Sequence, residues 1–156
     1  MSAVGRAAGT PLEWAVRGLV ALGLGVDAWV HLTHAGAMQL AAPGGVGGGA
    51  LFRVQGAVAA LTAVVVLLTG SRAAYAVAAL VALSALGPAL LYTYVEVPAL
   101  GPVPSMYDPT WSSAKVASVV AEAAVVALAL VGWRLTGRTG DAGTTKPPAV
   151  EARGRG

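Results

Sequence analysis

The sequence has no cysteine and little charge. Without cysteine, the chain can form no disulfide, thiolate metal site, iron–sulfur cluster or cysteine nucleophile. Charged residues make up 11% of its 156 residues, whereas a soluble globular domain carries about 25%. A water-soluble fold of this length would lack the polar surface that keeps it dispersed. The hydrophobic share of 56% and the mean hydropathy of +0.72 instead indicate that apolar side chains face lipid.

The motifs of several common chemistries are also absent. The sequence contains no Walker A loop, no GxGxxG dinucleotide fingerprint and no His-Glu-x-x-His zinc motif. The net charge of +3 does not indicate nucleic-acid binding, because the basic residues lie mostly at the ends of apolar blocks and in the C-terminal tail. We therefore expect the lipid bilayer as the main partner and no nucleic acid.

Four stretches are long and apolar enough to form membrane-spanning helices. A helix needs roughly 20 apolar residues to cross a hydrocarbon core about 30 Å thick. Backbone polar groups in lipid must bond within their own segment, and the alternating strands of a membrane β-barrel are absent here. The sequence therefore predicts an all-α, integral membrane four-helix bundle over residues 13–136, with helices at about 13–34, 51–69, 73–95 and 113–133.

The segments outside these helices differ in composition. Residues 35–50 are rich in glycine and predict a flexible loop, whereas residues 70–72 leave room only for a tight turn. Residues 96–112 are rich in proline and predict an ordered cap over one end of the bundle. Residues 1–12 form an N-terminal segment, and the Gly, Thr, Pro and charge of residues 137–156 predict a disordered tail.

Lysine and arginine predict the orientation of the bundle. Arg53 and Lys115 lie at the end opposite the termini, and the other eight of the ten basic residues lie on the side of the termini. Segments rich in these residues stay in the cytoplasm, so both termini are expected there. The aromatic residues agree, with three expected at the inner interface, Trp14, Tyr75 and Trp133, and three at the outer one, Tyr92, Tyr94 and Trp111.

An alternative for the N-terminal region is a secretory signal over residues 1–37, with Ala35–Ala37 as a small-residue cleavage site. Asp27 and the two histidines that follow it interrupt the apolar core that such a signal needs. The first apolar run is therefore interpreted as a membrane span.

Two carboxylates are expected near the middle of the membrane. Asp27 lies ten residues after Arg17, or about 15 Å along a helix, and Glu122 reaches a similar depth in the last helix. An ionisable side chain at that depth costs about 2.5–3.5 kcal/mol on insertion, so it indicates a functional site. Asp27, His31 and His34 follow i, i+4, i+7 spacing, which places them on one helix face.

Further polar residues are expected at the outer end of the bundle, where Arg53 begins the second helix and Glu96 follows the third. The complete predicted site comprises Asp27, His31, His34, Arg53, Glu96 and Glu122. Residues 96–112 are expected to act as a lid, or as a docking surface for an extracytoplasmic partner or other membrane subunits.

One interpretation of these groups is a purely structural network. Asp27 would pair with Arg53 or His31, and Glu122 would pair with Lys115 or Arg53. Such pairs would fix the helices relative to one another without binding anything.

Two other interpretations give the groups a ligand. A divalent metal would find nitrogen and oxygen ligands in His31, His34, Asp27 and Glu122. A thioether from Met38 or Met106 would suit copper(I). Alternatively, the same groups would hold a quinone head or another small molecule and exchange protons with it.

In size and in number of spans, the chain from Trp14 to Trp133 is similar to the small four-helix membrane proteins of high-GC bacteria, and in outline it resembles the DoxX-type family. The resemblance implies a multi-pass protein of the bacterial cytoplasmic membrane, linked with redox and quinone-associated systems, and it assigns no site residue. We expect a small accessory membrane subunit, linked to redox chemistry or to a ligand, with a His/carboxylate site in the outer half of the bundle. The alternatives are a protein that binds or transports a metal ion or small solute, and a scaffold of a membrane complex without site chemistry.

Overall fold

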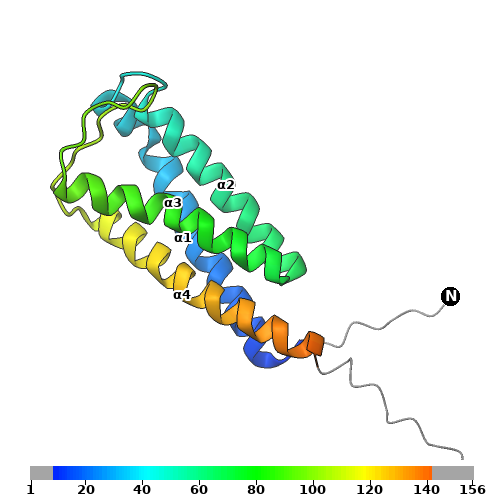
Figure 1. The fold of residues 1–156 in the computed structure, drawn as a ribbon. Coiled ribbons are helices and arrows are strands. Elements are labelled where there is room, and N and C mark those ends of the chain that lie inside the picture. Colours follow the sequence, from blue (N-terminus) through cyan, green and yellow to red (C-terminus); the bar gives the residue numbers. More distant parts are fainter. Residues whose placement is uncertain (1–8, 142–156) are drawn as a thin grey trace, which may run out of the picture.

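The computed structural model describes residues 9–141, with the side chains of residues 9–136, and this part of the chain forms four α-helices. Helix α1 covers Pro11–Ala41, α2 covers Gly48–Thr69, α3 covers Arg72–Tyr94 and α4 covers Ser113–Asp141. All four are long and apolar enough to cross a membrane, which confirms the predicted all-α bundle. Figure 1 shows the start of α1, the end of α4 and the α2–α3 turn at one end of the bundle, which is called the terminal end. The α1–α2 and α3–α4 connections lie at the opposite end, which is called the loop end.

Local signals set the helix ends. Thr10 and Glu13 form a capping box at α1, in which the Thr10 hydroxyl accepts from the Glu13 N–H and the Glu13 carboxylate accepts from the Thr10 N–H at 2.7 Å. Helix α2 ends at Thr69 and is followed by Gly70 as its C-cap, whose φ of 51° suits glycine. Ser71 then caps α3 by accepting from the Ala74 N–H at 3.1 Å.

The first helix is longer than the apolar run that predicts it. It continues beyond His34 to Ala41, so the glycine-rich connection covers residues 42–47 instead of residues 35–50. Glycine and polar side chains interrupt the apolar run here, but they leave the helical hydrogen bonding of the backbone intact. The helix ends just before Pro43, whose ring and missing N–H do not fit a helix interior.

Helix α4 also continues past its predicted end and reaches Asp141, so residues 137–141 of the predicted tail are helical. The rest of that tail, residues 142–156, lies outside the described residues, as do residues 1–8 of the predicted N-terminal segment.

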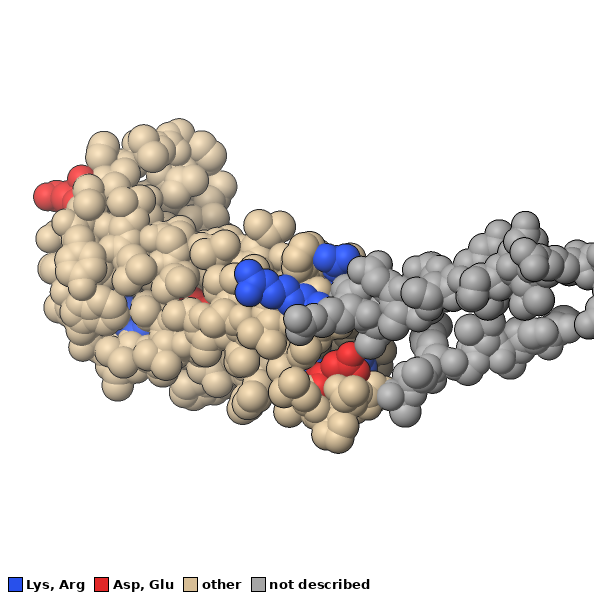
Figure 2. All heavy atoms as spheres, turned by 60° about the horizontal axis from the view of Figure 1, so that its bottom comes forward, with Lys and Arg blue, Asp and Glu red and all other residues tan. Residues whose placement is uncertain are grey.

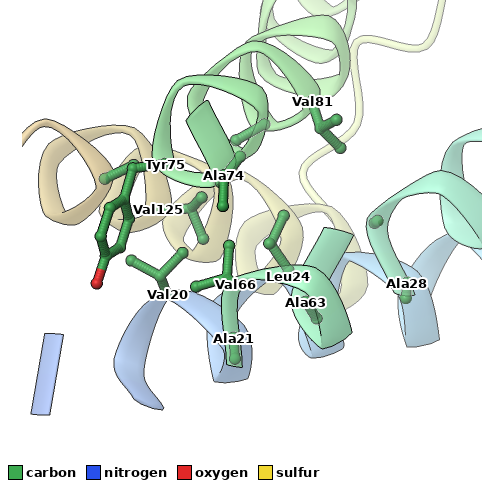
Figure 3. Packing of buried hydrophobic residues seen from close by; sticks show 14 of the residues in the cluster. Val20, Ala21, Leu24, Ala28, Ala63, Val66, Ala74, Tyr75, Val81 and Val125 are labelled. Atoms are coloured by element: carbon green, nitrogen blue, oxygen red, sulfur yellow. The ribbon is translucent and has the colours of Figure 1, made fainter. Parts of the chain in front are cut away.

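A core of small and branched residues fills the bundle toward the terminal end. Figure 3 shows side chains from all four helices pointing toward one another, among them Val20, Leu24, Val66, Tyr75 and Val125. Tyr75 is 2% exposed, so its side chain packs inside the bundle and does not face the lipid at the membrane interface. Its ring packs over Gly132 of α4, where an added Cβ atom would overlap it. Small residues thus let the helices approach closely enough to bury an aromatic ring.

The outside of the bundle is apolar, as a lipid environment requires. Large side chains point outward from every helix, including Leu22, Leu61, Leu68, Leu80 and Leu130. In Figure 2, most of the visible charged side chains lie toward the terminal end. There Arg17 stacks on Trp14 and Arg72 stacks on Trp133, with the guanidinium carbon 4.3 and 4.0 Å from the ring centroid. The four apolar helices imply that a lipid bilayer surrounds the protein.

The two connections at the loop end are bonded to each other. The Val46 N–H donates to the Pro102 carbonyl oxygen at 2.8 Å, and the Asp108 N–H donates to the Tyr92 carbonyl oxygen at 3.0 Å. Residues 95–112, called the cap from here on, are therefore attached both to the α1–α2 connection and to the end of α3. This proline-rich segment is a hydrogen-bonded cover over the bundle.

Gly132 and Gly25 provide a matched test of the packing. In Gly132→Ala, the added methyl group meets the ring of Tyr75, and we expect the free energy of unfolding to fall by about 1–3 kcal/mol, as in other overpacked cores. Gly25→Ala adds the same group where nothing lies within 4 Å, so we expect no loss. Thermal unfolding of both variants in one detergent measures the difference. Equal Tm values would contradict the packing of Tyr75 against α4.

Candidate functional site

A cavity of about 560 Å³ lies among the four helices in the half of the bundle near the loop end. All four helices and the cap contribute to its lining. Much of the lining is apolar and includes Val30, Met38, Phe52, Ala89 and Met106. The ionisable residues of interest form two groups. The floor cluster, deep in the bundle, consists of Asp27, His31 and Glu122, and the cap pair, near the loop end, consists of Asp108 and Lys115.

The floor cluster begins with a contact between two residues one turn apart on α1. The Nδ1 atom of His31 lies 2.6 Å from Oδ1 of Asp27 and 3.0 Å from the main-chain carbonyl oxygen of Asp27. Asp27 is fully buried and His31 is 9% exposed. Both contacts use Nδ1, and His31 also lines the cavity. A carboxylate at Nδ1 fixes the orientation of the imidazole ring.

Gln55 of α2 connects the floor cluster to two other helices. Its amide nitrogen donates to Oδ2 of Asp27 and to the carbonyl oxygen of Val81 on α3, each at 3.1 Å. Its amide oxygen accepts from the hydroxyl of Ser84 at 3.1 Å. One side chain therefore joins α1, α2 and α3 at the level of the buried carboxylate.

Glu122 brings α4 to the floor cluster. It is 1% exposed, and its Oε1 atom accepts from the hydroxyl of Ser118, one turn earlier, at 2.6 Å. Its Oε2 atom is buried and has no hydrogen-bond partner among the residues that the structure describes. One ligand atom from each of Asp27, His31 and Glu122 lies within 4.8 Å of the others. The two carboxylates that are 95 positions apart in the sequence therefore lie in one cluster.

The cap pair attaches the cap to α4. The Lys115 ammonium group lies 2.8 Å from Oδ2 of Asp108 and donates to the main-chain carbonyl oxygen of Asp108 at 2.6 Å. It also lies 3.4 Å from the hydroxyl of Thr93 on α3. Lys115, followed by the hydroxyl of Thr110, lowers the pKa of Asp108 from its usual 3.8 to about 2. Asp108 and Lys115 both line the cavity, so this ion pair forms part of its wall.

The other predicted site residues lie outside the floor cluster. His34 is an exposed residue that borders the cavity, and its Nδ1 atom contacts the carbonyl oxygen of Val30 at 2.9 Å. Arg53 and Glu96 are exposed and do not line the cavity. The structure therefore brings together Asp27, His31 and Glu122 and leaves the other three apart.

The expected pairing of charges also differs in part from the structure. Asp27 contacts His31, which is one of the two partners considered for it. Within residues 9–136, Glu122 forms an ion pair with neither Lys115 nor Arg53, because Lys115 binds Asp108 in the cap and Glu122 bonds to Ser118. Of the ion pairs considered from the sequence, the described residues therefore form only the one between Asp27 and His31.

Sequence reasoning did not include Gln55 and Ser118 in the site. Both lie in apolar spans, where an isolated polar residue by itself indicates a contact with another helix. Ser118 precedes Glu122 by one helical turn, so the spacing alone placed its hydroxyl beside that carboxylate. The contacts of Gln55 depend on how α2 is turned toward α1 and α3, which the spacing within α2 does not reveal.

Comparison with known proteins identifies no relative: no family model, curated protein or solved structure matches the chain. The resemblance to the DoxX-type family therefore stays a prediction, and the function has to be argued from the site itself.

Acid should loosen the cap through Asp108. Because the pKa of this carboxyl group is lowered from 3.8 to about 2 in the folded protein, its ion pair stabilises the cap fully above about pH 4 and is lost as the pH falls through about 2. We expect hydrogen exchange in residues 95–112, corrected for the intrinsic rate at each pH, to increase over this window. In Asp108→Asn, exchange should already be faster at neutral pH and the acid-dependent step should disappear. A wild-type cap that shows no such step would contradict this role of the ion pair.

Proposed function

We propose that this protein is an integral membrane protein that binds a small amphipathic molecule in the cavity at the loop end. The polar head of the molecule lies against His31 and Glu122, and its apolar part lies along the side chains of the cavity wall. The observation that carries the proposal is a cavity of about 560 Å³ with a buried cluster of ionisable side chains at its floor.

The size and chemistry of the cavity support a ligand of this kind. Small-molecule sites typically measure about 300–1,000 Å³ and combine an apolar wall with a few polar groups. Ionisable residues are expensive inside a membrane and mark functional sites there. Here His31 and Glu122 line a cavity that all four helices enclose, which favours a ligand site over a purely structural scaffold. A scaffold needs the contacts of Gln55 and Asp27 but gives no reason for the cavity above them.

The accessory, redox-linked form of this function is one version of the proposal. A quinone head at the floor would accept a proton from His31 or Glu122 or return one to it. In this version the protein serves other membrane subunits, or an extracytoplasmic partner that docks on the cap. Exposed side chains of the cap, Leu100, Tyr107 and Trp111, favour such a contact. This redox-linked version is also the one that a relationship to the DoxX-type family would imply.

A metal ion is the second candidate, because ligand atoms of Asp27, His31 and Glu122 lie within 4.8 Å of one another. Nitrogen and carboxylate oxygen ligands are those that zinc and other divalent transition metals accept. His34 would have to move to join them, since its ring nitrogen contacts the backbone of its own helix.

The proposed setting is the cytoplasmic membrane of a bacterium, with both termini in the cytoplasm and the cap on the outer side. The basic residues Arg17, Arg72 and Arg134 near the terminal end support this orientation through the positive-inside rule. The cavity would then lie in the outer half of the membrane.

A cavity-filling variant tests the ligand site. Ala89→Phe places a ring in the cavity, whereas Ala76→Phe places one on an exposed position of the same helix. We expect that at least one of three probes, benzyltrimethylammonium, its uncharged carbon analogue neopentylbenzene, or a decyl-substituted benzoquinone, raises the Tm of the wild type and of Ala76→Phe but not of Ala89→Phe. A probe at 100 times its Kd stabilises the folded protein by about 2.7 kcal/mol, which is readily measured. If no probe stabilises the wild type, or if Ala89→Phe responds like the wild type, the proposal fails.

The orientation can be tested with single cysteines, because the native chain has none. Leu100 in the cap and Leu12 at the start of α1 are both exposed. We expect a membrane-impermeant maleimide to label Leu100→Cys in intact bacterial cells and to label Leu12→Cys only after the membrane is permeabilised. The reverse pattern would invert the proposed topology.

A further inference from the structure

The charges around the cavity do not cancel at its floor. In the cap pair, Lys115 and Asp108 neutralise each other at 2.8 Å. The floor cluster holds two carboxylates and one imidazole, and within residues 9–136 neither carboxylate forms an ion pair with lysine or arginine. Even a doubly protonated imidazole would balance only one of the two carboxylates. The floor therefore lacks a positive charge when both carboxylates are ionised.

The two carboxylates differ in where their buried oxygens lie. Oδ2 of Asp27 accepts from the amide of Gln55, and its buried Oδ1 atom lies 2.6 Å from Nδ1 of His31 without a hydrogen bond among the described residues. Asp27 does not line the cavity. Glu122 has one oxygen engaged by Ser118, while its buried Oε2 atom has no partner among the described residues. Glu122 also lines the cavity. Because a buried anionic oxygen without a partner is unfavourable, this atom is the point at which a cationic group would bind.

The cavity wall suits a cation that carries apolar substituents. Phe52 lies against His31 with a ring centroid distance of 4.7 Å, and Tyr92 contributes a second aromatic side chain to the lining. Aromatic faces attract ammonium groups. The thioethers of Met38 and Met106 supply polarisable, adaptable contacts for alkyl groups.

A bare metal ion fits this arrangement less well. Asp27 is fully buried and does not line the cavity, so an ion inside the cavity would meet only His31 and Glu122 of the floor cluster. A zinc site needs three or four ligands. A cavity of about 560 Å³ is also far larger than a single ion requires.

We propose that the ligand of this cavity is a lipophilic organic cation, with an alkylated or aryl-substituted ammonium group held by the Glu122 carboxylate and with its apolar substituents against Phe52, Tyr92 and the methionines. The inference rests on the proposed function and names the class of ligand. Glu122 supplies the counter-charge, and the Asp27–His31–Gln55 network holds the floor in place around it. Lys115 does not oppose the cation, because Asp108 neutralises it.

The test compares a cation with an uncharged molecule of the same shape on the purified full-length protein in detergent. Isothermal titration calorimetry measures the binding of benzyltrimethylammonium and of neopentylbenzene, in which carbon replaces the charged nitrogen. We expect the cation to bind the wild type with a Kd at least about tenfold lower than that of the uncharged analogue, since only the cation gains a charge contact with the Glu122 carboxylate. Glu122→Gln, which keeps the shape of the side chain, should remove this preference. Glu96→Gln, which neutralises an exposed carboxylate away from the cavity, should retain it.

Each other outcome decides against the inference. Equal binding of the cation and the uncharged analogue, or tighter binding of the decyl-substituted benzoquinone than of the cation, overturns the cationic ligand but leaves the proposed small-molecule site standing. A preference for the cation that persists in Glu122→Gln overturns the role of Glu122. Binding of Zn²⁺ that displaces the cation and is lost in both His31→Ala and Asp27→Asn assigns the floor to a metal instead. If Glu122→Gln does not fold, Ala89→Phe replaces it, and a preference for the cation over the uncharged analogue that survives in Ala89→Phe overturns the inference.

Discussion

The contact between Asp27 and His31 is the constraint on which the rest of this structure depends. It places a carboxylate and an imidazole in the interior of a bundle whose outer surface is suited to lipid. Such groups cannot face acyl chains without a large loss of solvation energy, so α1 must turn this face toward the other helices. The amide of Gln55 then satisfies the second oxygen of Asp27 and bonds to the backbone of α3. The rotation of three helices is in this way linked to one buried carboxylate.

The two halves of the bundle are packed differently. Toward the terminal end, glycine and alanine let the helices approach closely, as where Gly132 receives the ring of Tyr75 and Gly23 meets Val125. Toward the loop end, the floor cluster and the cap keep a volume of about 560 Å³ free of side chains. The cap is not a loose connection, because Val46, Tyr92 and Lys115 each bond to it from a different element. A closely packed half thus supports a half that can receive a molecule.

The polar groups along the cavity divide into those that are balanced and one that is not. At the cap, Lys115 and Asp108 form a complete pair, and Asp27 lies outside the cavity lining, against His31 and Gln55. Among the described residues, only Glu122 combines full burial, a position in the cavity lining and an oxygen without a hydrogen-bond partner. A structural network gains nothing from such an atom, whereas a binding site uses it to select its ligand by charge. This difference is the physical basis for preferring a ligand site over a scaffold.

The sequence by itself determined the class of fold and the shared helix face of Asp27 and His31. Apolar runs of about 20 residues must be helical in lipid because the backbone has no other bonding partner there, and the spacing of Asp27 and His31 placed them on one face. Only the tertiary structure decided that Glu122 lies beside them, that Lys115 binds Asp108, that Gln55 joins three helices, and that Arg53 and Glu96 lie apart. The burial of Tyr75 in the core and the continuation of α1 to Ala41 were likewise visible only in the structure. The physical reason is that periodicity defines a face of each helix only relative to its own axis, whereas the direction in which that face points is set by packing against the other helices.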